Sequence, residues 1–170
     1  MIQKIKKLAA AYAEEFVAVR HHLHANPELS FQEHKTSAFI QAQLQKLNIS
    51  FKIIAGTGVV GLIEGRQPAS RVVALRADMD ALPIKEENDV NYKSKNEGVM
   101  HACGHDVHTT CLLGAAKILS ETKNEWKGTV KLIFQPGEEK NPGGASIMIK
   151  EGVLTNPAPE RIFALHVNPF

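Results

Sequence analysis

The spacing of apolar residues predicts two helices at the start of the chain. Over residues 5–23, apolar side chains recur every three or four positions, which is the period of an amphipathic helix. Pro27 ends this region. Ser30 and Glu33 then have the spacing of a capping box, so a second helix is expected to begin there and to end near Asn48. Its apolar stripe consists of Phe39, Ile40, Leu44 and Leu47.

The rest of the chain alternates between short apolar runs and helix-like segments, with a polar loop over residues 83–100. Runs rich in β-branched residues predict strands over residues 51–55, 59–63, 71–77, 129–135 and 161–166. Further helices are predicted over residues 108–119 and 145–151. This alternation favours an α/β fold in which helices flank a mixed or parallel β-sheet.

Composition limits the classes of partner. At 170 residues, with 44% hydrophobic and 22% charged residues, the chain can form one domain with a real core. The net charge of +2 is too small to indicate a nucleic-acid partner. No apolar run approaches the roughly 20 residues of a membrane span, so we expect no membrane partner. Two cysteines do not make a secreted disulfide framework, and we expect a cytoplasmic protein with a reduced thiol.

One short segment carries most of the candidate chemistry. Residues 100–108 read Met-His-Ala-Cys-Gly-His-Asp-Val-His. A soft thiolate beside imidazoles and a carboxylate favours a transition metal over calcium or magnesium. Cys103 and His105 are two positions apart and would diverge on a helix. We therefore place the pair on a loop, where both side chains point to the same side.

Other polar residues follow the predicted strands. Asp78 and Asp80 come after one apolar run, Glu138 and Glu139 after another, and His166 ends a third. Sites in open α/β sheets collect at the carboxyl ends of the strands. We therefore expect these side chains and the Cys-His segment to converge on one crevice.

Each of these features also has a simpler interpretation when it is taken alone. Adjacent glutamates are often a solvated turn, paired aspartates can cap a turn, and a lone thiol is often buried. A structural zinc site closes with four Cys or His ligands at tight spacings, whereas these candidates span more than sixty positions and include carboxylates. That mixture favours an open, catalytic site, in which one glutamate binds metal and its neighbour acts as general base toward water.

The remaining cysteine and histidines are assigned structural roles. Cys111 is expected in the core. Surface or packing roles are expected for His21, His22, His24 and His34.

Four motifs resemble the ordered signatures of the M20 metallopeptidase superfamily, in its N-acyl-L-amino-acid amidohydrolase and hippurate hydrolase branch. They occupy residues 76–83, 101–108, 134–139 and 165–168. The resemblance implies a zinc-exopeptidase-like catalytic domain. The implied reaction is hydrolysis of the amide bond of a small-molecule N-acyl amino acid to a carboxylate and a free amino acid.

The resemblance also implies site roles. It implies a centre of two divalent ions (zinc, manganese, nickel or cobalt) with the ligands Cys103, His105, Glu139 and His166. Glu138 would be the general base, and Asp80 would orient one of the metal ligands.

Members of this family are longer than this chain. Residues 1–170 would therefore be the N-terminal part of an incomplete catalytic domain, with the lid and dimerisation domain absent. A full-length form would be a homodimer, and the chain alone would be weakly active or inactive. The alternatives are a non-catalytic, truncated fragment that binds metal or a complementary chain, and a structural zinc protein.

Overall fold

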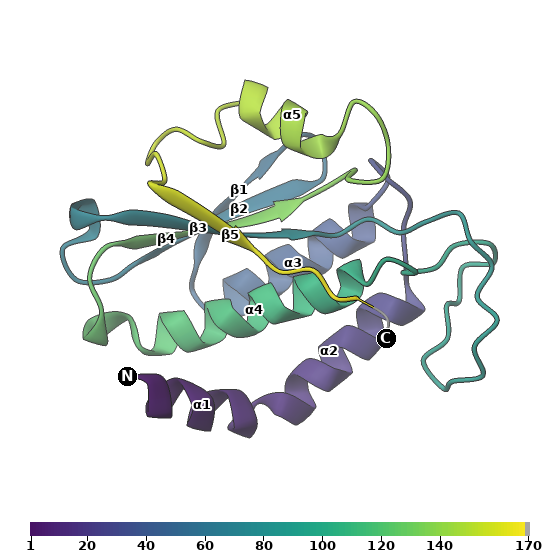
Figure 1. The fold of residues 1–170 in the computed structure, drawn as a ribbon, viewed down its shortest axis with the longest axis horizontal. Helices are drawn as coiled ribbons and strands as arrows, with labels where there is room; N and C mark the ends of the chain where they lie inside the picture. Colours follow the sequence, from purple (N-terminus) through teal and green to yellow (C-terminus); the bar gives the residue numbers. More distant parts are fainter. Residues whose placement is uncertain (169–170) are drawn as a thin grey trace.

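The computed structural model describes residues 1–168, which form three layers with a β-sheet in the middle (Figure 1). One face of the sheet is covered by helices α3 (His34–Lys46) and α4 (His105–Glu121), and helices α1 (Ile2–Ala11) and α2 (Ala13–Ala25) pack against the outer side of α4. The other face carries the short helix α5 (Gly144–Lys150). Two 3-10 turns, η1 (Pro68–Ser70) and η2 (Lys123–Glu125), connect elements at the surface.

The sheet is mixed, as the sequence predicts. Its strands are β1 (Ser50–Ile54), β2 (Gly58–Glu64), β3 (Val72–Asp78), β4 (Thr129–Gln135) and β5 (Arg161–Ala164), in the spatial order β1-β2-β4-β3-β5. β1, β2 and β4 pair antiparallel, whereas β3 pairs parallel with both β4 and β5. The carboxyl ends of β3, β4 and β5 therefore lie at the same edge of the sheet.

Two apolar clusters hold the layers together. The larger lies between the sheet and helices α3 and α4, and it includes Ile40, Leu113 and Phe134, all of which are 0–1% exposed. The smaller lies under α5 and joins Met148 to the opposite face of the central strands. Alternation along β4 places successive side chains in the two clusters in turn.

The predicted first helix is two helices. The chain breaks at Tyr12, whose φ of −98° and ψ of 2° depart from helical values. The Tyr12 hydroxyl donates a hydrogen bond to Glu121, and Lys117 forms an ion pair with Glu15, so both helices are tied to α4. No residue of α1 is buried.

The predicted capping box is wrong. Helix α3 begins at His34, and neither Ser30 nor Glu33 caps it, because the amides of its first turn at Lys35 and Thr36 donate to the side chain of Glu28. Ser30 instead donates a hydrogen bond to Asp80, with 2.6 Å between the oxygens. Glu33 is fully buried and accepts hydrogen bonds from Thr57 and from the amide of Gly137. Both polar side chains are thus committed to distant partners rather than to their own helix.

The other predicted elements agree with the structure to within a few residues. The main differences are that α4 begins at His105, three residues early, and that β5 ends at Ala164. The expectation of a buried Cys111 is wrong, because this cysteine is exposed. Among residues 1–168, no helix combines the length and the apolar character needed to cross a bilayer.

Candidate metal centre

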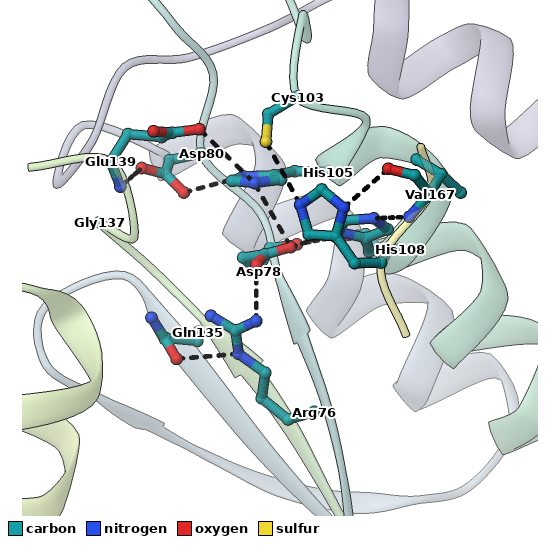
Figure 2. A network of polar contacts seen from close by, with 12 residues as sticks. Arg76, Asp78, Asp80, Cys103, His105, His108, Gln135, Gly137, Glu139 and Val167 are labelled. Atoms are coloured by element: carbon teal, nitrogen blue, oxygen red, sulfur yellow. Dashed lines mark hydrogen bonds and ion pairs between the residues drawn. The ribbon is translucent and has the colours of Figure 1, made fainter. Parts of the chain in front are cut away.

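The predicted convergence of strand ends is observed. Figure 2 shows Asp78, Asp80, Cys103, His105 and Glu139 pointing toward one another above the ends of β3 and β4. They come from three segments far apart in the sequence, and the parallel pairing of the strands brings those segments together. His166 reaches the same place from the residues that follow β5, because its Nε2 lies 3.5 Å from the Cys103 sulfur.

Three of the predicted ligands form a tight group. The ligand atoms of Cys103, His105 and His166 all lie within 4.8 Å of one another. Cys103 is partly exposed, His105 is fully buried and His166 is exposed, so the group opens from the protein interior toward solvent. Sulfur and imidazole donors at this separation form a donor set that a transition metal ion fits.

The local backbone differs from the predicted loop. His105 is the first residue of α4, and Gly104 precedes it with a φ of +84°. This left-handed turn lets Cys103 and His105 share one side although only His105 is helical. A Cβ on Gly104 would lie 2.3 Å from a methyl group of Val167. Glycine at this position therefore permits the close approach of the chain that carries His166.

The two glutamates lie on the turn after β4. Gly137 has a φ of +55°, and a Cβ there would come within 2.4 Å of the Phe31 ring. The amide of Gly137 donates to the buried carboxylate of Glu33 over 2.8 Å. The turn is therefore held by the hydrogen bond to Glu33 and by the packing of the Phe31 ring against Gly137.

This turn presents both glutamate carboxylates to the centre. Glu138 and Glu139 are exposed, and their oxygens lie within 4.8 Å of each other and of a His105 nitrogen. The distance from Glu139 Oε1 to His105 Nε2 is 3.8 Å. The structure thus brings Glu138, Glu139 and His105 together without assigning the separate roles of the two glutamates.

Asp80 connects these segments. Its carboxylate accepts hydrogen bonds from His105 Nδ1 over 3.2 Å and from the amide of Glu139 over 3.0 Å. Burial raises the pKa of Asp80, but hydrogen bonds from His105, Ser30 and the Glu139 backbone outweigh it and hold the pKa at about 2. An ionised Asp80 therefore orients His105 and positions the Glu139 turn.

His105 supplies the strongest indication that the centre fits a cation. With Nδ1–H donating to Asp80, its Nε2 points into the group, and this buried atom has no hydrogen-bond partner among residues 1–168. Burial lowers the pKa of His105, but Asp80 and Asp78 raise it overall. The same negative charges stabilise a metal cation at Nε2. For the Cys103 thiol the effect of burial has the opposite sign, and burial raises its pKa to about 11.

A second group lies directly beside the first. Asp78, His105 and His108 are buried and offer ligand atoms within 4.8 Å of one another. His108 donates from Nδ1 to Asp78 over 2.6 Å, and its Nε2 accepts from the amide of Val167 over 3.0 Å. Asp78 also accepts from Arg76 over 2.6 Å.

Sequence reasoning missed a buried network under the start of α4. His24 is 4% exposed and lies between Asp106, 2.8 Å from Nδ1, and Glu86, 3.0 Å from Nε2. The hydrogen bond to Asp106 is the main cause that raises the pKa of His24. Asp106 also accepts from Arg20 and directly follows His105, so the network pins the first turn of α4. Asp106, which lies within the Cys-His segment, was the one residue in the sequence that pointed to this network.

Comparison with known proteins places this geometry in a family. The profile described as "Peptidase family M20/M25/M40" matches residues 74–170. The N-acyl-L-amino acid amidohydrolase of Geobacillus stearothermophilus is 49% identical over 153 residues, which cover 89% of this chain and 41% of that protein. IAA-amino acid hydrolase ILR1-like 4 of Arabidopsis thaliana is 51% identical over 153 residues, covering 89% of this chain and 33% of that protein.

A solved structure agrees with these matches. The YxeP protein of Bacillus subtilis, described as a dinuclear metal-binding peptidase from the M20 family, matches with a TM-score of 0.87 and 41% identity. The match covers 94% of this chain and 44% of that one. The chain therefore spans 33–44% of the length of these three relatives. The profile match over more than half of the chain, with the sequence and fold similarity, shows that this chain belongs to peptidase family M20/M25/M40.

Proposed function

We propose that this chain supplies the metal-binding part of an amidohydrolase that cleaves N-acyl amino acids to a carboxylate and a free amino acid. The observation that carries the proposal is the meeting of Cys103, His105 and His166 beside two glutamates. Similarity to an N-acyl-L-amino acid amidohydrolase and an IAA-amino acid hydrolase supports a small amide substrate with an amino acid as one product.

In this proposal two divalent ions are held by Cys103, His105, Glu139 and His166. The dinuclear description of YxeP supports the number of ions. Zinc, manganese, nickel and cobalt all suit a site that mixes thiolate, imidazole and carboxylate donors. When bound, the ions would polarise the amide carbonyl and make water more acidic.

Glu138 is the proposed general base. Its exposed carboxylate takes a proton from the attacking water as the new C–O bond forms, and it returns that proton to the nitrogen as the C–N bond breaks. Asp80 keeps His105 and the Glu139 turn in place through its hydrogen bonds. The carboxylate and the amine leave as separate products.

We further propose that residues 1–170 are the N-terminal part of a catalytic domain. In the full-length protein, the rest of this domain and a dimerisation domain would follow, and the protein would form a homodimer. The share of each relative that the chain covers supports this division. The second candidate is a non-catalytic fragment that binds a complementary chain. It is favoured by the exposed edge strand β5 and its continuation, where Phe163 is 56% and Leu165 is 72% exposed.

The test combines metal titration with turnover of N-acetyl and N-benzoyl amino acids. The chain is assayed alone and with a polypeptide that covers the remaining length of the G. stearothermophilus relative. We expect two ions per chain, weak or no turnover by the chain alone, and much faster turnover in the complemented sample. Metal binding without turnover in either sample would favour the non-catalytic fragment, and failure to bind any of the four metals would refute the centre.

Glu138→Gln separates the two glutamates. We expect it to abolish turnover in the complemented sample while the metal content stays at two ions. Glu87→Gln makes the same change at an exposed carboxylate outside the centre, and it should leave both readouts unchanged. Loss of metal from the Glu138 variant would show that the roles of Glu138 and Glu139 are reversed.

A further inference from the structure

The candidate ligand His166 lies outside the hydrogen-bonded sheet. The pairing of β5 with β3 ends at Ala164, opposite Arg76, and residues 165–168 are exposed. A ligand on such a segment is held in place only if other contacts fix its backbone and its ring. The contacts around Val167 and His108 do both.

Val167 is held by both of its peptide groups. Its amide donates to Nε2 of His108 over 3.0 Å, and its carbonyl accepts from Nδ1 of His166 over 2.7 Å. With Nδ1 protonated, His166 presents an unprotonated Nε2 on the side of Cys103, 3.5 Å from the sulfur. The Val167 side chain packs over Gly104, which leaves room for it only because it lacks a Cβ.

The hydrogen bonds fix the tautomer of His108. A backbone amide can only donate, so Nε2 of His108 must carry a lone pair toward Val167. The carboxylate of Asp78 accepts, so Nδ1 must carry the proton. The rings of His108 and His166 also contact each other, with centroids 4.7 Å apart.

The chain of contacts ends in the sheet. Asp78 accepts from Arg76 on the same strand over 2.6 Å, and Arg76 donates from Nε to Gln135 on the neighbouring strand over 2.9 Å (Figure 2). These strands are β3 and β4, which lie next to each other in the interior of the sheet. Hydrogen bonds through His108 and Asp78 therefore tie the backbone of Val167 to the central strands of the sheet.

Asp78 and His108 could instead be metal ligands, because they form a close group with His105. The hydrogen bonds argue against this. The one lone pair of His108 already accepts from Val167, and Arg76 and His108 each hold one oxygen of Asp78, whereas the buried Nε2 of His105 has no partner in the described chain. A ligand whose lone pair is already bonded to an amide would have to give up that bond to bind metal.

We propose that Asp78 and His108 are positioning residues that hold His166 through the Val167 peptide and do not bind metal themselves. This inference rests on the metal centre proposed above. It assigns His108 the Nδ1-protonated tautomer both without and with metal.

The first test is long-range ¹H–¹⁵N correlation NMR of the chain with ¹⁵N-labelled histidine. We expect His108 to show a protonated Nδ1 and an unprotonated Nε2 at neutral pH, with little change on addition of Zn²⁺. The signals are assigned by comparison with the His108→Gln variant. An Nε2-protonated His108, or a Zn²⁺-induced change typical of a coordinated nitrogen at His108, would overturn the proposal.

We call the hydrogen bonds from Asp78 through His108 to the Val167 amide the relay. The second test uses two variants of His108, each of which keeps one of these two hydrogen bonds. In His108→Gln the amide oxygen lies near the former Nε2 and can still accept from Val167. In His108→Asn an N–H group lies near the former Nδ1 and keeps the bond to Asp78, but Val167 loses its acceptor. We expect His108→Asn to bind Co²⁺ about 10- to 100-fold more weakly than the parent chain, and His108→Gln to retain more of the affinity.

The Co²⁺ absorption spectrum adds a readout that a folding defect would not produce. We expect His108→Asn to keep the thiolate-to-cobalt band of Cys103 while its ligand-field bands change, because only His166 is released. Equal Co²⁺ affinity in both variants and the parent would overturn the relay. If the parent chain binds no metal but His108 shows the expected tautomer, the proposed function fails and the relay geometry stands.

Discussion

Asp80→Asn tests the electrostatic support of the centre most directly. The substitution keeps the shape of the side chain and removes its charge. Asp80 is 1% exposed and accepts hydrogen bonds from His105, Ser30 and the amide of Glu139. An amide side chain has one acceptor oxygen, and its NH₂ group would face a donor. At least one buried donor therefore loses its partner.

Two estimates of the cost agree. A pKa lowered from 3.8 to about 2 in the folded state corresponds to about 2 kcal/mol of stabilisation. This contribution is present above the unfolded pKa of 3.8 and is lost as the pH falls through about 2. Loss of a charged acceptor from buried donors independently costs about 1.5–3 kcal/mol. We therefore expect Asp80→Asn to lower the free energy of unfolding by about 2 kcal/mol at pH 7.

The assay is urea denaturation of metal-free protein, followed by circular dichroism, with metal titration of the same samples. The metal affinity of Asp80→Asn should fall about 10- to 100-fold, because His105 loses the group that orients it. Asp89→Asn makes the same change at an exposed position and should shift stability by less than about 0.5 kcal/mol.

The pH dependence identifies the cause. At pH 3 the difference in stability between the parent chain and Asp80→Asn should be smaller than at pH 7, because the stabilisation by the charge is then partly lost. Equal stability and equal metal affinity at pH 7 would refute the role given to Asp80. A difference that does not shrink at pH 3 would show that the lost hydrogen-bond acceptor, and not the charge, is responsible.

Three further predictions concern the loop that carries the thiol. Cys103→Ser should bind metal far more weakly, since a hydroxyl replaces a soft thiolate poorly; Cys111→Ser, at an exposed cysteine, should match the parent, and equal affinity in both variants would exclude Cys103 as a ligand. Because burial raises the pKa of Cys103 to about 11, the thiol is protonated at pH 7 and metal binding must release a proton. Metal affinity measured by calorimetry should therefore rise from pH 6 to pH 8, and a flat profile would contradict this. Gly104→Ala should lower both stability and metal affinity, because its Cβ would meet Val167 at 2.3 Å. Gly98→Ala shares the positive φ but meets no atom within 4 Å, so it should cost only the roughly 1–2 kcal/mol of backbone strain, and equal losses in the two variants would exclude the clash.

Local patterns in the sequence were sufficient for most of the fold. The strand over residues 129–135 is predicted with the bounds that the structure has, because its apolar and β-branched residues are contiguous and bounded by turns. The position of polar residues after three such runs was also sufficient to predict their convergence, since parallel strands end at a common edge.

Local patterns failed where a side chain had a distant partner. Ser30 and Glu33 have the spacing of a capping box, but Ser30 donates to Asp80 and Glu33 accepts from the amide of Gly137 instead. His24 has no local feature that indicates burial, and it is buried because Asp106 and Glu86 arrive from other elements. Such hydrogen bonds depend on which segments the fold places together.

The sequence by itself determined the order of most helices and strands, the α/β class and the residue types able to bind metal, because these follow from periodicity and donor chemistry. Only the tertiary structure decided which polar groups have free lone pairs. Asp78 and His108 lie as close to His105 as ligands would, yet the single imidazole lone pair of His108 is committed to Val167, and the carboxylate of Asp78 is held by Arg76 and His108. A lone pair can make one strong bond at a time, and the partner that occupies it is fixed only when distant segments meet.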